Sequence, residues 1–221
     1  MRRYNLKLNP GKSVFGEDNI HYLGYSISGE GIRQGEEKMK AIEEFLTPDS
    51  PKKICEFVGL ANYFRFLLPN FSAHSAKLTD LFKKELAYKP GPLPEEAQQA
   101  FKALQAGLVS NPLVAYPWAN KDFILTTDAA TGNSENAGGM GAVLSQLHED
   151  GSKRVIAYAS RGLKANEKNY SVYLLKQAAA AWAISNFAVY LYGRRFTLYT
   201  DHKPLETQSA PCTQRCLTWS K

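Results

Sequence analysis

The chain is poor in cysteine and has no long apolar run. Its three cysteines, Cys55, Cys212 and Cys216, are an odd number at spacings that suit no disulfide framework. A reducing compartment inside the cell is therefore expected. Cys212 and Cys216 could be half of a zinc site, but no second pair accompanies them, so free thiols are the simpler interpretation. No apolar run approaches the roughly 20 residues of a membrane helix, and no apolar stretch follows the basic start, so we expect neither a membrane partner nor a secretory leader.

Positive charge is in excess, and it is unevenly spread. The net charge is +6 and the pI is about 9.1. Residues 1–50 carry seven basic and eight acidic groups, residues 51–120 carry eight and five, and residues 121–221 carry twelve and eight. The excess therefore lies in the last two thirds of the chain. A basic balance favours polyanionic partners such as nucleic acid, although many basic proteins bind none.

The first half of the chain predicts a short extended region followed by helices. Residues 20–27 are rich in aromatic and aliphatic side chains, as strands are, and Ser28-Gly29-Glu30-Gly31 predicts a turn. Ser50-Pro51 is a cap residue followed by proline at the first helical position. Lys89 to Pro94 contains three prolines and is expected to be a linker. Apolar spacing predicts helices over residues 36–46, 51–68, 75–84 and 95–108.

The second half predicts a mixed layer of strands and one long helix. Turn residues at Asn133 and at Asp150-Gly151 separate the first three strands, which indicates an antiparallel meander. An alanine-rich helix is expected from Glu167 to Tyr190, where Gly193 stops it. Strands are predicted over residues 123–127, 140–147, 154–159 and 196–200. Three strands, a helix and a further strand imply a mixed α/β layer.

Two aspartates follow predicted strands and could share a site. Asp128 follows the first strand and Asp201 follows the fourth, with the long helix between them in sequence. Such an order can bring both carboxylates to one sheet edge. Oxygen ligands suit Mg²⁺, and two metals held by carboxylates can cleave a phosphodiester. From the pattern alone, aspartates that merely end strands are the simpler interpretation.

Several motifs follow one another along nearly the whole chain. The earlier ones are 8–12, 22–27, 57–65, 69–72 and 78–84. The later ones are 127–130, 139–146, 192–196 and 200–205. In collinear order, these motifs resemble the Pol polyproteins of gypsy-type long-terminal-repeat retrotransposons. The later motifs resemble the RNase H domain of that family, and the earlier ones resemble the end of the palm and the thumb of its reverse transcriptase.

The resemblance implies an α+β fold, with a helical thumb and connection region followed by an incomplete RNase H-like mixed α/β domain. It implies a palm end with a primer-grip hairpin over 1–34, a thumb over 35–92, a connection over 93–120 and the RNase H-like domain over 121–221. The family places such proteins inside the cell, in a cytoplasmic particle or in the nucleus. The implied partners are nucleic acid, as RNA–DNA hybrid or template–primer duplex, and the remainder of the Pol polyprotein.

The resemblance also assigns roles to single residues. Asp128 and Asp201 match two carboxylates that hold Mg²⁺ and cut the RNA of a hybrid. The hairpin residues Tyr22, Leu23 and Gly24 match the region that steadies the primer end. Basic groups of the thumb could contact phosphates. These thumb cations include Lys52, Lys53 and Arg65.

The sequence departs from the family pattern in three ways. The residues that perform polymerisation would precede position 1, so this chain is not expected to polymerise DNA by itself. The family's catalytic glutamate, early in the long helix, aligns with Lys176, whose ammonium could pair with Asp128 and Asp201. Glu167, nine residues earlier, is a poor substitute for that glutamate, and Glu135, in an apparent insertion after Asp128, is a remote candidate. The family domain also continues with another strand and a helix beyond the matched motifs, which leaves a sheet edge open.

Three functional hypotheses remain open from the sequence. The first is a segment of a retrotransposon reverse transcriptase and RNase H that binds nucleic acid and is catalytically inactive. The second is an active Mg²⁺-dependent RNase H portion of a longer Pol polyprotein. The third is a domesticated, noncatalytic binding module. The position of the Lys176 nitrogen relative to Asp128 and Asp201 separates the first from the second.

Overall fold

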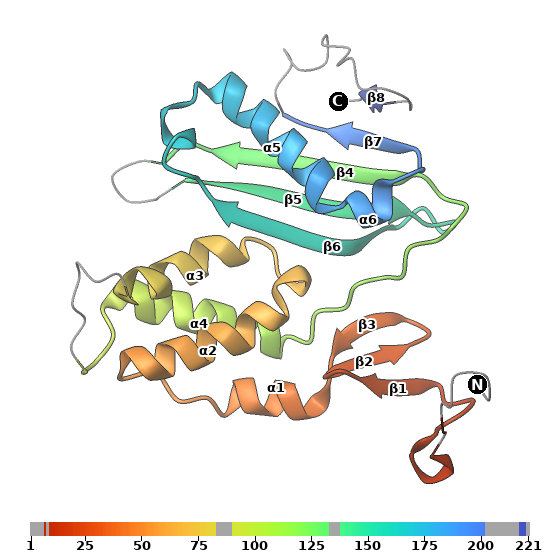
Figure 1. The fold of residues 1–221 in the computed structure, drawn as a ribbon, viewed down its shortest axis with the longest axis horizontal. Helices are drawn as coiled ribbons and strands as arrows, with labels where there is room; N and C mark the ends of the chain where they lie inside the picture. Colours follow the sequence, from red (N-terminus) through yellow and green to blue (C-terminus); the bar gives the residue numbers. More distant parts are fainter. Residues whose placement is uncertain (1–6, 8, 83–89, 133–137, 202–216, 220–221) are drawn as a thin grey trace.

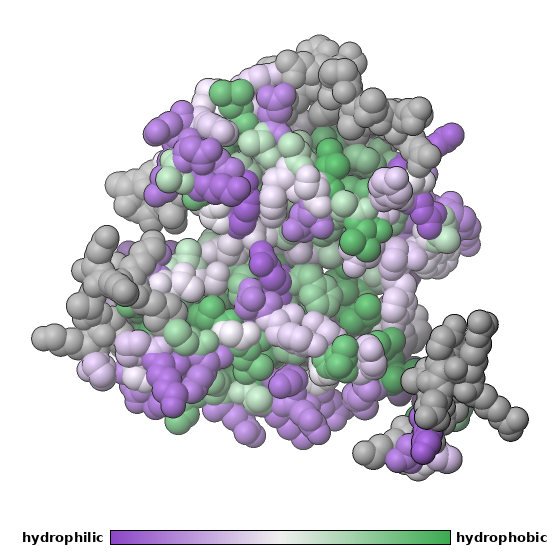
Figure 2. All heavy atoms as spheres, in the orientation of Figure 1, coloured by the Kyte–Doolittle hydropathy of each residue, from purple (hydrophilic) through white to green (hydrophobic). Residues whose placement is uncertain are grey.

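The structure, a computed structural model, describes residues 7, 9–82, 90–132, 138–201 and 217–219. A small N-terminal sheet and a group of helices lie on one side of the molecule, and a larger sheet with one long helix lies on the other (Figure 1). A segment around residues 110–122 connects the helices to the larger sheet. Polar side chains dominate the face shown in Figure 2, with smaller apolar areas between them.

The N-terminal sheet is an antiparallel meander of three short strands, preceded by the 3-10 turn η2 (Pro10–Lys12). Its strands are β1 (Asn19–Tyr22), β2 (Tyr25–Ser28) and β3 (Gly31–Gln34). The predicted turn lies between β2 and β3, where Ser28 pairs with Gly31. A backbone bridge between Ile32 and Val114 ties β3 to the connecting segment. This bridge holds the meander beside the helical region, against the segment that leads to the larger sheet.

The helical region contains the predicted helices with shifted ends. The second predicted helix ends at Tyr63 and continues only as a 3-10 turn, because Phe64 leaves helical geometry. The third begins at Phe71, four residues earlier than predicted, and Asn70 precedes it with a left-handed φ of 52°. The elements are α1 (Glu36–Glu43), α2 (Pro51–Tyr63), η3 (Arg65–Leu67), α3 (Phe71–Thr79), η4 (Asp80–Phe82) and α4 (Glu95–Val109). The predicted linker is without helix or strand over its described part, 90–94.

Large apolar side chains form the core of this region. Phe57 and Phe101 pack with ring centroids 4.5 Å apart, and both are at most 2% exposed. Gln105 binds the backbone carbonyls of Ile42 and Phe45 at the end of α1 through its side-chain amide. This contact supplies donors to carbonyls that lack a partner at a helix end. The apolar periodicity of α2 and α4 therefore predicted the core correctly.

The larger sheet has five strands in the order β6-β5-β4-β7-β8. Its first three strands form the predicted antiparallel meander, and β7 and β8 add in parallel. The strands are β4 (Phe123–Ala130), β5 (Gly139–Leu147), β6 (Lys153–Gly162), β7 (Phe196–Tyr199) and β8 (Leu217–Trp219). One expectation was wrong: Asp128 lies inside β4, because pairing with β5 continues to Ala130. The sequence also did not predict β8, which pairs with β7.

The long helix is shorter than predicted. Residues 167–169 form the separate turn η5 (Glu167–Asn169), and α5 (Val172–Asn186) begins only after Ser171, whose hydroxyl accepts a bond from the Leu174 amide. Tyr170 between them is extended. After Phe187 the chain forms the short α6 (Ala188–Leu191). Alanines of α5 let the helix lie close against β4, where Ala179 and Ala183 are fully buried.

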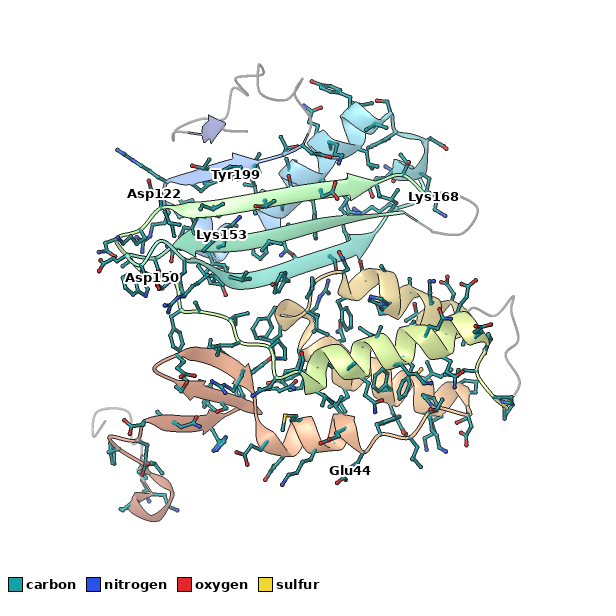
Figure 3. All side chains as sticks on the ribbon, turned by 180° about the vertical axis from the view of Figure 1, so that it is seen from behind. Glu44, Asp122, Asp150, Lys153, Lys168 and Tyr199 are labelled. Carbon is teal, nitrogen blue, oxygen red and sulfur yellow. The ribbon has the colours of Figure 1, made fainter. Side chains whose placement is uncertain are left out.

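The two halves of the molecule are joined by specific contacts. Phe66 packs against the cores of both the helical region and the larger sheet. The Ser160 carbonyl on β6 accepts a bond from Arg65, and its hydroxyl accepts one from the Ser72 amide. Lys153 and Tyr199 lie on the sheet face opposite α5, with the Lys153 ammonium 5.7 Å from the ring centroid (Figure 3). Within the described residues, no helix is long and apolar enough to span a bilayer.

Candidate nuclease-like site

A lysine ammonium lies between two carboxylates at one edge of the larger sheet. Lys176 Nζ on α5 is 2.5 Å from Asp128 Oδ1 on β4 and 2.7 Å from Asp201 Oδ2, which follows β7. Lys176 is 48 and 25 positions away from these two aspartates in sequence. The structure therefore brings together Asp128, Lys176 and Asp201, the three positions that the family pattern indicated.

The register of two parallel strands explains why the aspartates meet. Thr126 on β4 is paired with Tyr199 on β7. Asp128 and Asp201 each lie two residues further along, so their carboxylates reach the same edge of the sheet. The helix α5 crosses this sheet and presents Lys176 in its second turn. Its buried neighbours Leu175 and Ala179 fix the helical phase, and with it the direction of the lysine side chain.

The charges of this cluster are unequally exposed. The side chain of Lys176 is 9% exposed, whereas those of Asp128 and Asp201 are 74% and 66% exposed. Burial works to lower the pKa of Lys176, but the hydrogen bonds and charges of the two carboxylates outweigh it, so its pKa is raised. The lysine is thus a permanent cation at neutral pH. The backbone amide of Ala129 donates a further bond of 2.7 Å to Asp128 Oδ1.

These side chains do not fit a bound Mg²⁺ as they stand. The ammonium takes one oxygen of each carboxylate, and it occupies the space between them where a cation would bind. In the described part of the chain, no group of three or more histidine, cysteine or acidic side chains could hold a metal ion. Hard divalent cations need several oxygen ligands together. The site therefore provides two exposed carboxylates that share a fixed internal cation.

Glu167 is held in a different pair and does not reach this site. Its carboxylate accepts bonds of 2.6 and 2.8 Å from the two terminal nitrogens of Arg161, and another from the Lys164 amide. The bonds from Arg161 lower the pKa of Glu167 to about 2, although burial opposes this shift. The prediction that the long helix begins at Glu167 was wrong, because α5 begins after it. Glu135 lies outside the described residues.

The hairpin residues form an exposed tip on the N-terminal sheet. Tyr22 and Leu23 are 60% and 67% exposed. Leu23 and Gly24 both have positive φ, of 49° and 79°, as a tight two-residue turn requires. The Tyr63 hydroxyl of α2 donates a hydrogen bond to the Leu23 carbonyl, and the Tyr63 ring stacks on Tyr25 at 5.0 Å. The tip is therefore fixed to the helical region while its side chains face solvent.

The three cations that the family resemblance assigned to a thumb, Lys52, Lys53 and Arg65, have different environments. Lys52 is exposed, and no described residue forms an ion pair with it. Lys53 pairs with Asp49 at 2.9 Å. Arg65 donates to the Ser160 carbonyl at 2.8 Å and so joins the helices to β6. Of these three, Lys52 is the group whose charge is fully available to a phosphate.

Sequence reasoning missed an exposed basic turn after α6. Tyr192 is 91% exposed, and Arg194 and Arg195 are exposed without an ion pair to any described residue. Gly193, with a φ of 76°, makes the turn between Tyr192 and Arg194. Two adjacent arginines beside an exposed aromatic are typical of nucleic-acid contacts. The Tyr-Gly-Arg-Arg sequence carried this signal in addition to its likeness to the family.

A family model for the RNase H-like domain found in reverse transcriptase matches residues 119–221. Two relatives come from Drosophila melanogaster. The chain is 37% identical to the retrovirus-related Pol polyprotein from transposon 412 over 204 residues, which is 92% of the chain and 16% of that protein. It is 36% identical to the Pol polyprotein from transposon gypsy, over 91% of the chain and 19% of that protein. The chain thus spans less than a fifth of the length of these relatives.

Solved structures show the same fold. The foamy viral protease-reverse transcriptase in complex with dsDNA aligns with a TM-score of 0.69 and 18% identity, over 91% of this chain and 40% of that one. The same protein in complex with an RNA/DNA hybrid aligns with a TM-score of 0.67, over 87% of this chain and 26% of that one. At this identity the likeness extends to the fold, which includes both the helical region and the larger sheet.

Proposed function

Because this chain belongs with the Pol polyproteins of LTR retrotransposons and residues 119–221 match the RNase H-like domain found in reverse transcriptase, we propose that it binds RNA–DNA hybrid or template–primer duplex without cutting it. The observation that carries this proposal is the position of Lys176 Nζ, within hydrogen-bond distance of both Asp128 and Asp201. The lysine stands where the family needs a third carboxylate.

Electrostatics supports the loss of cleavage. Two metal ions between carboxylates would activate water and stabilise the leaving oxygen when bound. A unit positive charge about 4 Å from a cation costs on the order of 4 kcal/mol for each positive charge of that cation at an effective dielectric of 20. That cost opposes metal binding by orders of magnitude. Asp128 and Asp201 would instead remain paired with Lys176 in the complex with nucleic acid.

Binding itself rests on the basic balance of the chain and on exposed groups in both halves. Lys52 on α2 and the turn of Tyr192, Arg194 and Arg195 after α6 present charges that no described residue neutralises. The structural neighbours that contain both regions were solved with dsDNA and with an RNA/DNA hybrid. We assign these groups to phosphate contacts, and the hairpin tip at Tyr22 to contact with the primer strand.

Cleavage of a labelled RNA–DNA hybrid tests the catalytic part. We expect no cleavage by the unmodified chain with Mg²⁺ or Mn²⁺, and the same result for Asp128→Asn. Lys176→Glu rebuilds the three-acid set and should gain metal binding, measured by calorimetry, with or without turnover. Mg²⁺-dependent cleavage by the unmodified chain that disappears in Asp128→Asn would overturn the proposal in favour of an active RNase H portion of a longer Pol protein.

Affinity for the hybrid tests the binding part. Log affinity should fall linearly with log salt, with a slope that counts the phosphates contacted. Lys52→Gln should reduce that slope by about one, whereas Lys53→Gln, whose charge is already shared with Asp49, should reduce it less. An affinity that is undetectable at low salt would exclude nucleic-acid binding and favour a module that binds protein.

A further inference from the structure

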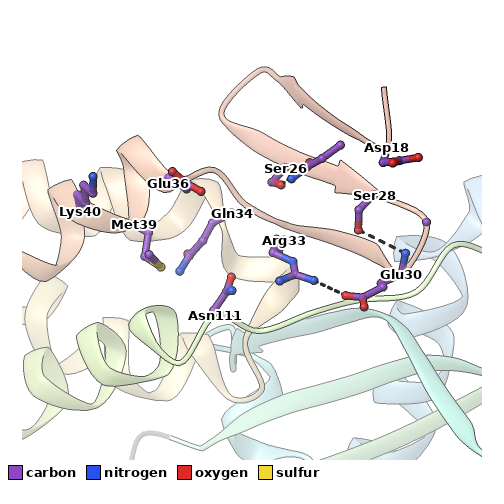
Figure 4. Close-up of a pocket in the computed structure, with 12 residues that line it drawn as sticks. Asp18, Ser26, Ser28, Glu30, Arg33, Gln34, Glu36, Met39, Lys40 and Asn111 are labelled. Carbon is purple, nitrogen blue, oxygen red and sulfur yellow. Dashed lines mark hydrogen bonds and ion pairs between the residues drawn. The ribbon is translucent and has the colours of Figure 1, made fainter. Parts of the chain in front are cut away.

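A polar groove lies between the N-terminal sheet and the helical region, away from the nuclease-like site. Its volume is about 650 Å³. Residues of β2 and β3 form one wall, the first turns of α1 form another, and Asn111, just after α4, closes the floor (Figure 4). The side chains that matter for its chemistry are Asp18, Glu30, Arg33, Gln34, Glu36 and Asn111.

Two buried amide oxygens in this groove lack a hydrogen-bond partner. Gln34 is 2% exposed, and its Nε2 donates to the Leu108 carbonyl, so its Oε1 is directed the other way. Neither Gln34 Oε1 nor Asn111 Oδ1 accepts a bond from a described residue, although both atoms are buried. In Figure 4 the side chain of Gln34 extends from the end of β3 and that of Asn111 from the segment just after α4, and both enter the space between these elements. Buried acceptors without donors are costly, which makes this pair a ready site for a donor group.

Carboxylates surround these acceptors at the mouth of the groove. Glu30 is paired with Arg33 at 2.7 Å, so their charges largely cancel. Asp18 and Glu36 remain exposed, and no described residue forms an ion pair with either. Lys40 is the other cation in the lining. The groove therefore has a net charge of about −1 within a chain of net charge +6, and it repels phosphate.

We propose that this groove binds the guanidinium of an arginine side chain carried by another polypeptide segment. A guanidinium is planar and presents five N–H donors in a fixed fork, which can serve two carbonyl oxygens and a carboxylate together. An ammonium offers its donors from a single atom and matches separated acceptors less well. A metal ion is disfavoured because no cluster of three acidic, histidine or cysteine ligands exists among the described residues.

The inference is independent of the proposed function, because it concerns the opposite side of the hairpin from its exposed tip. The tip at Tyr22 faces solvent beside α2, whereas the groove is lined by Ser26 and Ser28 of the next strand. One side of the N-terminal meander would thus contact nucleic acid, and the other would contact protein. An experiment can therefore disprove the binding of protein in the groove without disproving the binding of nucleic acid, and the reverse.

The test is a titration of the intact chain with N-acetyl-L-arginine amide, followed through the side-chain amide signals of Gln34 and Asn111 by NMR. We expect saturable shifts of both signals and no change in hybrid affinity. The matched ligands are the citrulline analogue, which keeps the shape without the charge, and the lysine analogue, which keeps the charge without the fork. Both should bind at least about tenfold more weakly.

Variants locate the site. Asn111→Gly removes the acceptor and tolerates the positive φ of 53° at this position, so it should fold and bind about tenfold more weakly. Glu36→Gln should also weaken binding, whereas Glu43→Gln, an exposed acid on the same helix outside the groove, should not. Absence of saturable shifts, equal binding of the citrulline or lysine analogue, or unchanged affinity in Asn111→Gly would each overturn the proposal.

Discussion

Two ion-pair clusters flank the start of α5, and they are built in opposite ways. In the first, Arg161 holds Glu167 through two bonds, and the two side chains are 20% and 9% exposed. In the second, Lys176 is 9% exposed while its partners Asp128 and Asp201 are 74% and 66% exposed. The first cluster pairs its two charges inside the protein and is structural, although Arg161 Nε is buried without a partner among the described residues. The second keeps its cation inside and offers its carboxylates to solvent, as an exposed functional site would.

The largest expected loss in the free energy of unfolding comes from removing one partner of the structural pair, Arg161 and Glu167. Glu167→Ala leaves the Arg161 guanidinium partly buried without its carboxylate, and it removes the acceptor of the Lys164 amide. Removing one partner of a buried pair costs about 3 kcal/mol, so we expect a loss of that order in the free energy of unfolding by urea. A loss below that of Lys176→Met would contradict the assignment of the structural role to this pair.

Acid should weaken the same pair by a smaller amount. The pKa of Glu167 is lowered to about 2 by the bonds from Arg161, whereas an unfolded glutamate titrates near about 4.3. Between these values the unfolded chain binds more protons, so stability present above about pH 4.3 is lost as pH falls toward about 2. Glu167→Gln should show a flatter decline than the unmodified chain in unfolding measured across this range. Parallel curves would show that the pair does not control acid stability.

Neutralising the lysine should cost less than breaking the structural pair. Lys176→Met leaves two carboxylates that repel each other, but both are mostly exposed and water screens them. Methionine also fills the buried space of the lysine stem. We expect a loss of about 1 kcal/mol in the free energy of unfolding. The loss should shrink in high salt, which the Glu167→Ala loss should not.

The smallest expected loss in the free energy of unfolding concerns Ser171, which lies between the two ion-pair clusters in sequence. The Ser171 hydroxyl caps α5 by accepting from the Leu174 amide at 3.3 Å. Ser171→Ala should lower the free energy of unfolding by about 0.5 kcal/mol, at the weak end for such caps because the bond is long. Ser171→Thr is the matched control and should keep most of the stability that the cap contributes. A loss larger than that of Lys176→Met would show that α5 depends on its cap more than on its charges.

Much of the fold could be predicted from the sequence. Apolar periodicity located α2 and α4 because their buried positions follow the helical repeat, and turn residues located the hairpins. The break at Tyr170 could not be predicted, since Glu167 is a good helix former, yet it lies in the separate turn η5 and binds Arg161, six positions earlier. β8 was missed because its pairing with β7 depends on the register of two segments that are distant in sequence.

The candidate site was predictable in part. The residues at Asp128, Lys176 and Asp201 were indicated by family motifs, but the burial of Lys176 and the exposure of the aspartates depend on how α5 packs against the sheet. The buried oxygens of Gln34 and Asn111 had no sequence signal, because the two residues lie 77 positions apart and line the same groove only through the packing of α4 beside the meander.

Phe66 has a consequence for how the molecule unfolds. Its partly buried ring packs against the cores of both halves, and the Ala115 amide donates to the Val155 carbonyl at 2.7 Å, which also joins the halves. If either half unfolds, apolar surface of the other half that this ring now covers becomes exposed to water. The two halves should therefore melt in a single cooperative transition, with calorimetric and van't Hoff enthalpies that agree. Residues 119–221 expressed alone would expose an apolar area to water where this ring now lies.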